Sequence, residues 1–198
     1  MSKKKLLPAI DFNSPVILSL FFISLLLLIL NNFLPRNTIH SLFACYFTGW
    51  LDPFLYPRLF THVLAHQNLA HFTGNYLLML AIGPLLEEKY GSGSLIRMMV
   101  ITAGITGLIH IVFFRNVALV GASGLVFMTI LLASFTNIRE GRLPMTVLLV
   151  GFLYIGNEVI RGLLSTDNIS QLSHIIGGIC GAGFGFEYQG IQYRRKRH

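Results

Sequence analysis

Apolar residues along this chain come in long runs that are separated by short polar segments. The first run extends from Val16 to Leu34 and is interrupted only by serine and asparagine. Five further runs follow at Leu69–Leu86, Leu95–Phe114, Gly121–Asn137, Met145–Leu163 and Gln171–Gln189. A helix that spans a bilayer needs about 20 mostly apolar residues. The pattern therefore predicts an all-α, polytopic membrane protein with six transmembrane helices.

The segments between the runs carry residues that end helices. Four of them are short and rich in glycine, polar or charged residues: Tyr90–Gly93, Arg115–Asn116, Arg139–Pro144 and Ser165–Asn168. The first connection, Pro35 to Gln67, is longer and rich in aromatic side chains. Aromatic residues favour the membrane–water interface, so we expect this connection to lie half-embedded there.

Composition supports lipid as the solvent of this chain. Hydrophobic residues make up 54% and charged residues 12%, against roughly 25% charged in a soluble domain. The mean hydropathy is +0.66. No stretch outside the apolar runs is long enough to form a second core, so we expect one membrane domain at 16–190 between a cytoplasmic tail at 1–15 and a basic cytoplasmic tail at 191–198. The first run is too long for a signal peptide and is expected to be a retained anchor.

The net charge of +7 is distributed as membrane topology requires. With six spans and a cytoplasmic amino terminus, eleven Lys and Arg residues fall inside and four, Arg36, Arg58, Arg115 and Arg161, fall outside. This excess obeys the positive-inside rule, so the charge does not indicate a nucleic-acid partner. The two cysteines, Cys45 and Cys180, predict no structural disulfide.

Polar residues inside apolar runs are costly and are candidates for function. They are His71, Asn75, His110, Ser123, Glu158 and His174. His71 and Asn75 share one helix face near the outer end of the second span, because they are four residues apart. Ser123 opens the fourth span and His174 lies near the outer end of the sixth. Four groups distant in sequence are therefore expected at one depth, toward the outer leaflet.

These four residues fit acyl-transfer chemistry. Ser123 is a weak nucleophile until an imidazole such as His174 accepts its proton. Free N–H groups at a helix start, together with His71 and Asn75, could stabilise an oxyanion. Read singly, a serine at a helix start is usually a cap, and an intramembrane histidine or asparagine usually bonds a neighbouring helix.

Small residues predict how the fourth and sixth spans meet. Gly121 and Gly124 flank Ser123 and leave the nucleophile uncrowded. Gly177, Gly181 and Gly185 form one stripe on nearly the same face as His174. Such stripes let helix backbones approach closely, so we expect the sixth span to pack against the fourth and bring His174 to Ser123.

Three histidines near the start of the second span offer a metal site as an alternative. His62, His66 and His71 are closely spaced, but Val63 follows His62, so the metalloprotease H-E-x-x-H motif is absent. No carboxylate accompanies them, and we expect no metal and no cofactor.

Several of these segments resemble the rhomboid family of intramembrane serine proteases, over about residues 50–190. They are RLFTHVLAHQNLAHFTGN at Arg58–Asn75, GPLLEEKYG at Gly83–Gly91, GASG at Gly121–Gly124 and SHIIGG at Ser173–Gly178. The resemblance implies a bacterial, six-helix protein of the inner membrane that cuts transmembrane segments of other proteins without metal or cofactor. It makes Ser123 the nucleophile and His174 the general base, with His71, Asn75 and the Ser123 N–H as the oxyanion hole.

The resemblance also has departures and rivals. Phe127 stands where bacterial relatives often have tyrosine beneath the base. Glu158 is not assigned as the acid of a catalytic triad, because nothing in the sequence indicates that it lies close to His174. One rival is a silent rhomboid-like protein that binds transmembrane clients, and another is a small transporter. A transporter predicts inverted internal repeats, which the sequence does not show.

Overall fold

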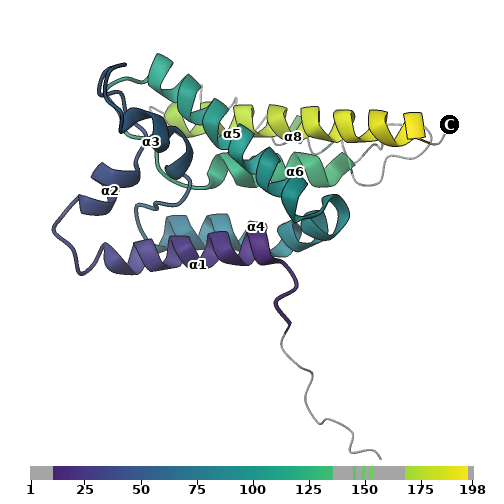
Figure 1. Ribbon diagram of the computed structural model, residues 1–198, viewed down its shortest axis with the longest axis horizontal. Coiled ribbons are helices and arrows are strands. Elements are labelled where there is room, and N and C mark those ends of the chain that lie inside the picture. The colour runs from purple at the N-terminus through teal and green to yellow at the C-terminus, as the bar shows by residue number, and fades with distance from the viewer. Residues whose placement is uncertain (1–10, 136–144, 146–148, 150–151, 154–167, 196–198) are drawn as a thin grey trace, which may run out of the picture.

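The computed structural model describes residues 11–135, 145, 149, 152–153 and 168–195, and these form seven helices and no strand (Figure 1). The helices are α1 (Pro15–Leu30), α2 (Thr38–Phe43), α3 (Leu55–Thr61), α4 (Leu69–Tyr90), α5 (Ser92–Phe113), α6 (Ser123–Ser134) and α8 (Asn168–Arg195). The predicted all-α class is confirmed for this part of the chain. Five of the six apolar runs coincide with helices, and the run Met145–Leu163 lies outside the described residues except at four isolated positions.

Local sequence signals set the ends of α4 and α5. The side chain of Asn68 caps α4 by accepting a hydrogen bond from the amide of His71 at 2.8 Å. Gly91 separates the two helices with a φ of +79°, which glycine adopts without steric cost. Each helix has 22 residues and is therefore about 33 Å long, enough to cross a hydrocarbon core of about 30 Å.

The helices pack around α6, which is the shortest of the predicted spans that the structure describes. Figure 1 shows α1 beside α4, α8 beside α6, and α5 crossing over the bundle. α6 contacts α4, α5 and α8, so the segment that begins at Ser123 is enclosed by other helices. Its twelve residues correspond to only about 18 Å, and eight of them are buried.

A carboxylate fastens α1 to the turn between α4 and α5. Glu87 accepts hydrogen bonds from the hydroxyl of Ser14 at 2.6 Å and from the amide of Val16 at 2.9 Å. It also accepts from the amide of Ile17 at 3.2 Å and from the hydroxyl of Ser92 at 2.7 Å. The free amides and positive dipole end of a helix start favour such a carboxylate. One side chain from α4 thereby fixes where α1 begins.

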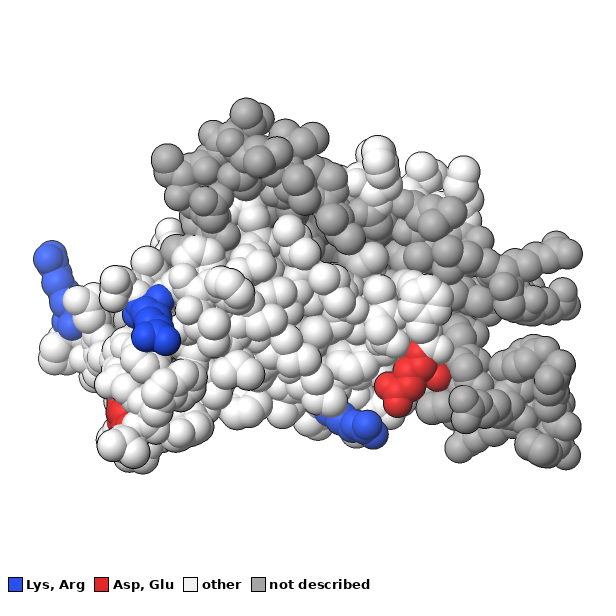
Figure 2. All heavy atoms as spheres, turned by 90° about the horizontal axis from the view of Figure 1, so that it is seen from above, with Lys and Arg blue, Asp and Glu red and all other residues white. Residues whose placement is uncertain are grey.

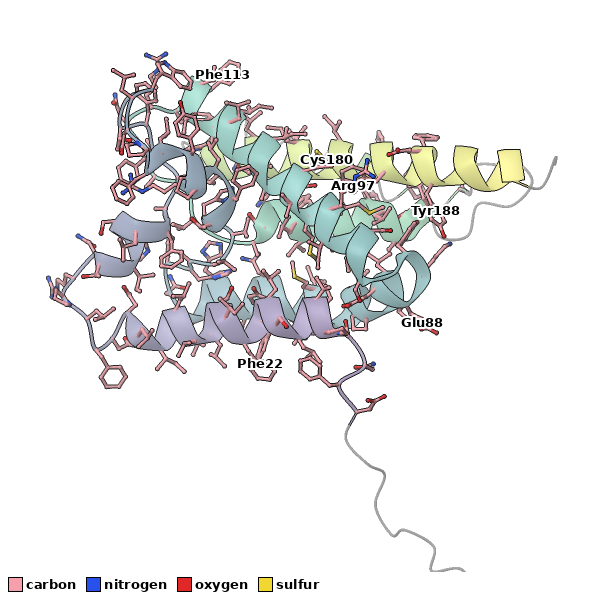
Figure 3. The ribbon with its side chains drawn as sticks, viewed as in Figure 1. Phe22, Glu88, Arg97, Phe113, Cys180 and Tyr188 are labelled. Carbon is pink, nitrogen blue, oxygen red and sulfur yellow. The ribbon has the colours of Figure 1, made fainter. Side chains whose placement is uncertain are left out.

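The surface of the bundle suits a membrane. α4 and α5 are long and apolar enough to cross one, while α1 and α6 are apolar but have only 16 and 12 residues. Figure 2 shows the charged side chains of one face toward the two ends of the described part, with an uncharged band between them. Phe113 lies at one end of the bundle, and Glu88 and Tyr188 lie toward the other (Figure 3). The count of six spans stays a prediction.

The first connection folds over the Phe113 end of α5. Its helix α3 packs so closely on α5 that a methyl group at Gly107 would lie 2.6 Å from the carbonyl oxygen of Leu59. Arg58 ties the connection together, because it donates to the carbonyl of Ser41 at 2.7 Å and lies over the ring of Tyr46. The interfacial placement of this connection stays a prediction.

Candidate active site

The four candidate residues line one open cavity of about 550 Å³. His71 and Asn75 come from α4, Ser123 from the start of α6, and His174 from α8. The other described residues of the wall come from the end of the first connection (Gln67), from α4 (Ala70, Gly74 and Leu78), from the segment before α6 (Val117–Val120) and from α6 (Val126 and Phe127). The structure therefore brings together all four residues that the sequence singled out.

The cavity reaches well below the Phe113 end of the bundle. A methyl group at Gly124 would lie 3.2 Å from the side chain of Thr106, so the start of α6 is level with Thr106 of α5. Thr106 precedes Phe113 by seven residues, which corresponds to about 10 Å along a helix. Ser123 therefore lies at a depth of roughly a third of the length of α5, measured from the Phe113 end, and not at that end.

Ser123 occupies the first position of α6 and is accessible to the cavity. Every other residue from Leu119 to Thr129 is buried, whereas Ser123 is partly exposed. The side chain of its N-cap residue, Ala122, makes no capping hydrogen bond. Because the first amides of a helix have no intrahelical partner, the Ser123 end of α6 offers N–H donors and a positive dipole end.

His174 is held by an aromatic ring and by close helix packing. Its imidazole stacks on the ring of Phe127 at 4.1 Å between centroids and 10° between planes. One turn further along α8, a methyl group at Gly177 would overlap the carbonyl oxygen of Gly124. The backbones of α6 and α8 are therefore in contact beside Ser123 and His174.

The glycine stripe of α8 continues this contact. A methyl group at Gly181 would overlap the backbone of Met128 in α6, and one at Gly185 would overlap the side chain of Phe135, the residue that follows α6. The prediction that the stripe packs against the fourth span is confirmed.

His71 and Asn75 both point toward the segment before Ser123. Gly121 has a φ of +112°, and a methyl group there would lie 2.5 Å from the His71 ring and 3.6 Å from Nδ2 of Asn75. Asn75 is only 7% exposed, and its Nδ2 has no hydrogen-bond partner among the described residues. A buried donor without a partner is costly and rare, so it marks a place where a ligand group could accept.

The segment before Ser123 is held by backbone hydrogen bonds to the first connection. The amide of Cys45 donates to the carbonyl of Leu119 at 2.9 Å, and the amide of Leu119 donates back at 2.8 Å. The amide of Gly121 donates to the carbonyl of His62 at 2.9 Å. These bonds fix the approach of the chain to α6.

Two histidine rings also form hydrogen bonds with the segment before Ser123. The amide of Ala122 donates to Nε2 of His66 at 3.4 Å, and Nε2 of His110 donates to the carbonyl of Val117 at 2.8 Å. Burial lowers the pKa of His66, which lies between α3 and α4, to about 4. The ring is therefore neutral near pH 7, and with its one proton on Nδ1 the lone pair of Nε2 accepts from Ala122.

These supporting roles were missed by the sequence analysis. From the sequence, His62 and His66 were candidate metal ligands and part of the segment that resembles the rhomboid family, and His110 was a polar residue inside a span. Within the described part of the chain, no three His, Cys, Asp or Glu side chains gather as a metal ion would require. The spacing of the histidines carries no signal for a hydrogen bond to a backbone 56 residues away. Glu158 lies outside the described residues.

Comparison with known proteins gives concordant matches. The sequence pattern of the rhomboid domain matches residues 54–189. The chain is 28% identical over 127 residues to rhomboid protease GluP of Bacillus subtilis (strain 168), covering 64% of this chain and 25% of that protein. It is 28% identical over 151 residues to rhomboid-related protein 1 of Caenorhabditis elegans, covering 69% of this chain and 42% of that protein.

The chain thus spans less than half the length of these two relatives. The rhomboid pattern, in contrast, covers more than half of this chain and includes all four candidate residues of the cavity. With its apolar helices and the rhomboid pattern over residues 54–189, this protein belongs to the membrane-embedded rhomboid family.

Proposed function

We propose that this chain is an intramembrane serine endopeptidase that hydrolyses peptide bonds in or near transmembrane segments of other membrane proteins. The observation that carries the proposal is the convergence of Ser123, His174, His71 and Asn75 on one cavity from three helices. One of the relatives is itself named a rhomboid protease.

The proposed nucleophile is the hydroxyl oxygen of Ser123. It attacks the carbonyl carbon of the scissile bond while its proton passes to the imidazole of His174. The stacked ring of Phe127 limits the orientations of that imidazole. Stacking replaces part of the orientation that a hydrogen-bonded acid provides in a catalytic triad.

The proposed oxyanion hole combines the amide of Ser123 with the side chains of His71 and Asn75. The free Nδ2 of Asn75 is a donor that loses little by binding a new acceptor, because it has no partner to give up among the described residues. Donors that are already in place when negative charge develops need no reorganisation during the reaction. This is the role we propose for the α4 face of the cavity.

The remaining steps use the same groups. His174 gives its proton to the leaving amine, which frees the carboxyl-terminal product and leaves an ester on Ser123. Water then attacks the ester with His174 as base, and breakage of the C–O bond restores the hydroxyl. The proposed reaction requires neither a metal nor a cofactor.

We further propose six spans, cytoplasmic termini and a bacterial inner membrane as the location. The distribution of Lys and Arg supports this topology. Protease protection of tags at each end of the chain, in sealed inverted vesicles, tests it. Both tags should be digested, and protection of either tag contradicts the topology.

The activity is tested by cleavage of a transmembrane reporter protein by the purified chain. Ser123→Ala and His174→Ala should each abolish cleavage, and the double variant should be no worse, because the two residues act as one unit. A silent rhomboid-like binder would retain the reporter without cleaving it, whichever variant is used. Cleavage that survives either single substitution contradicts the proposed dyad.

A further inference from the structure

A second cavity, of about 510 Å³, shares no residue with the candidate active site. It is a groove between α1 and α5, with α3 at one end and Leu125 of α6 also in its lining. Among the described residues that line it, Ser19, Thr61 and Ser92 are the only polar ones, and none is ionisable. We call it the α1–α5 groove. Such a lining suits an apolar ligand and offers almost no hydrogen bonds to a polar one.

The length of the groove matches one leaflet of a bilayer. Along α5 it extends from Ser92 to Ala103, twelve residues whose eleven helical steps correspond to about 16 Å. One leaflet contributes about half of a hydrocarbon core of about 30 Å. The groove begins where both α1 and α5 begin, at Pro15 and Ser92. It therefore covers the hydrocarbon depth of the leaflet at that end, which is the cytoplasmic end in the proposed topology.

Helix α3 closes the groove at mid-depth. Phe60 and Thr61 line it, and the ring of Phe60 would lie 2.8 Å from a methyl group at Gly104, just beyond Ala103. A transmembrane helix, which needs the full thickness of the core, cannot lie along a groove that ends halfway. A linear apolar chain that enters from one leaflet can.

The groove is also open to lipid along its side. Ile23, Ile96 and Val100 line it and are 47%, 48% and 48% exposed. Left empty, these walls would lose the van der Waals contacts that a close-packed neighbour provides. We propose that the α1–α5 groove binds one acyl chain of a phospholipid from the leaflet at its open end.

The bound chain would contact the segment that supports the candidate active site. Val63 and Leu64 line the groove. They lie between His62, whose carbonyl accepts from Gly121, and His66, whose ring accepts from Ala122. Filling the groove therefore stabilises this connection as well as the pair α1 and α5, so bound lipid should raise the melting temperature.

Photo-crosslinking tests the proposal without reference to proteolysis. The full chain is reconstituted in vesicles that contain a phosphatidylcholine with a diazirine near the middle of one acyl chain, and labelled peptides are mapped by mass spectrometry. Ser19→Trp and Val100→Trp fill the groove from its two walls. Ile101→Trp is the matched control, because Ile101 is exposed on the same helix but does not line the groove.

We expect wild-type labelling to concentrate on the groove residues of α1 and α5. Both groove variants should lose most of that labelling, while Ile101→Trp keeps it and labelling near the exposed Leu77 of α4 stays constant in all samples. The melting temperature in short-chain detergent should rise when long-chain phosphatidylcholine is added, and the rise should be absent in Val100→Trp. Uniform labelling of every exposed face, or equal loss in Ile101→Trp, overturns the proposal.

Discussion

The close contact between α6 and α8 gives a sharp test of how the candidate site is assembled. Gly177 lies one turn from His174, and a side chain there would overlap the carbonyl oxygen of Gly124, which follows Ser123. The obstacle is backbone, so no side-chain rotation can relieve it. Gly177→Val must therefore separate the two helices that carry the proposed nucleophile and base.

The expected magnitude follows from this geometry. Overpacking a close contact costs about 1–3 kcal/mol of stability. Moving the helices apart by about 1 Å can lower a rate roughly 10²-fold, because the reacting groups no longer align. Gly177→Val should thus lose most cleavage of a transmembrane reporter and melt at a lower temperature, although it removes no proposed catalytic group.

A second glycine of α8 provides the control. Gly183 is exposed, and a methyl group there would meet nothing within 4 Å. Gly183→Val makes the same chemical change in the same helix and should leave turnover and melting temperature nearly unchanged. Equal effects at the two positions, or normal turnover and melting temperature in Gly177→Val, would refute the inferred role of this contact.

Three further substitutions probe single interactions. Asn75→Ala should lower turnover by roughly tenfold to a thousandfold, the range for loss of one oxyanion donor, with an unchanged circular dichroism spectrum; normal turnover would remove Asn75 from the oxyanion hole. Phe127→Ala should lower turnover by freeing the ring of His174, whereas Phe127→Tyr keeps the stacking and should retain activity. Equal rates in the two variants would show that the stacking does not contribute to turnover. Glu87→Ala removes the acceptor for four donors, three at the start of α1 and Ser92 at the start of α5, and should lower the free energy of unfolding by about 1.5–3 kcal/mol; an unchanged melting temperature would contradict that role.

The apolar pattern predicted the helices because lipid-facing segments must satisfy their backbone groups internally. It was less exact at their ends. The fourth predicted span began at Gly121, whereas α6 begins at Ser123, because Gly121 has a positive φ and Gly121 and Ala122 donate to partners outside the helix. Apolar composition does not distinguish a residue in the first turn from one in the loop before it.

The candidate site was predicted from spacing and topology. His71 and Asn75 share a face because they are four residues apart, and the orientation of successive spans placed Ser123 and His174 at a similar depth. The supports from His62 and His66 were not predictable in the same way. They depend on how the first connection folds back onto the segment before α6. The spacing of apolar residues in the sequence does not predict that path.

The central claim is that Ser123 is a nucleophile activated by His174. It is tested most directly by treating the purified chain with a fluorophosphonate and locating the adduct by mass spectrometry. We predict one adduct on Ser123 in the wild-type chain, a large loss of labelling in His174→Ala and none in Ser123→Ala. An unlabelled wild-type chain, an adduct on another serine, or full labelling of Ser123 in His174→Ala would contradict the account.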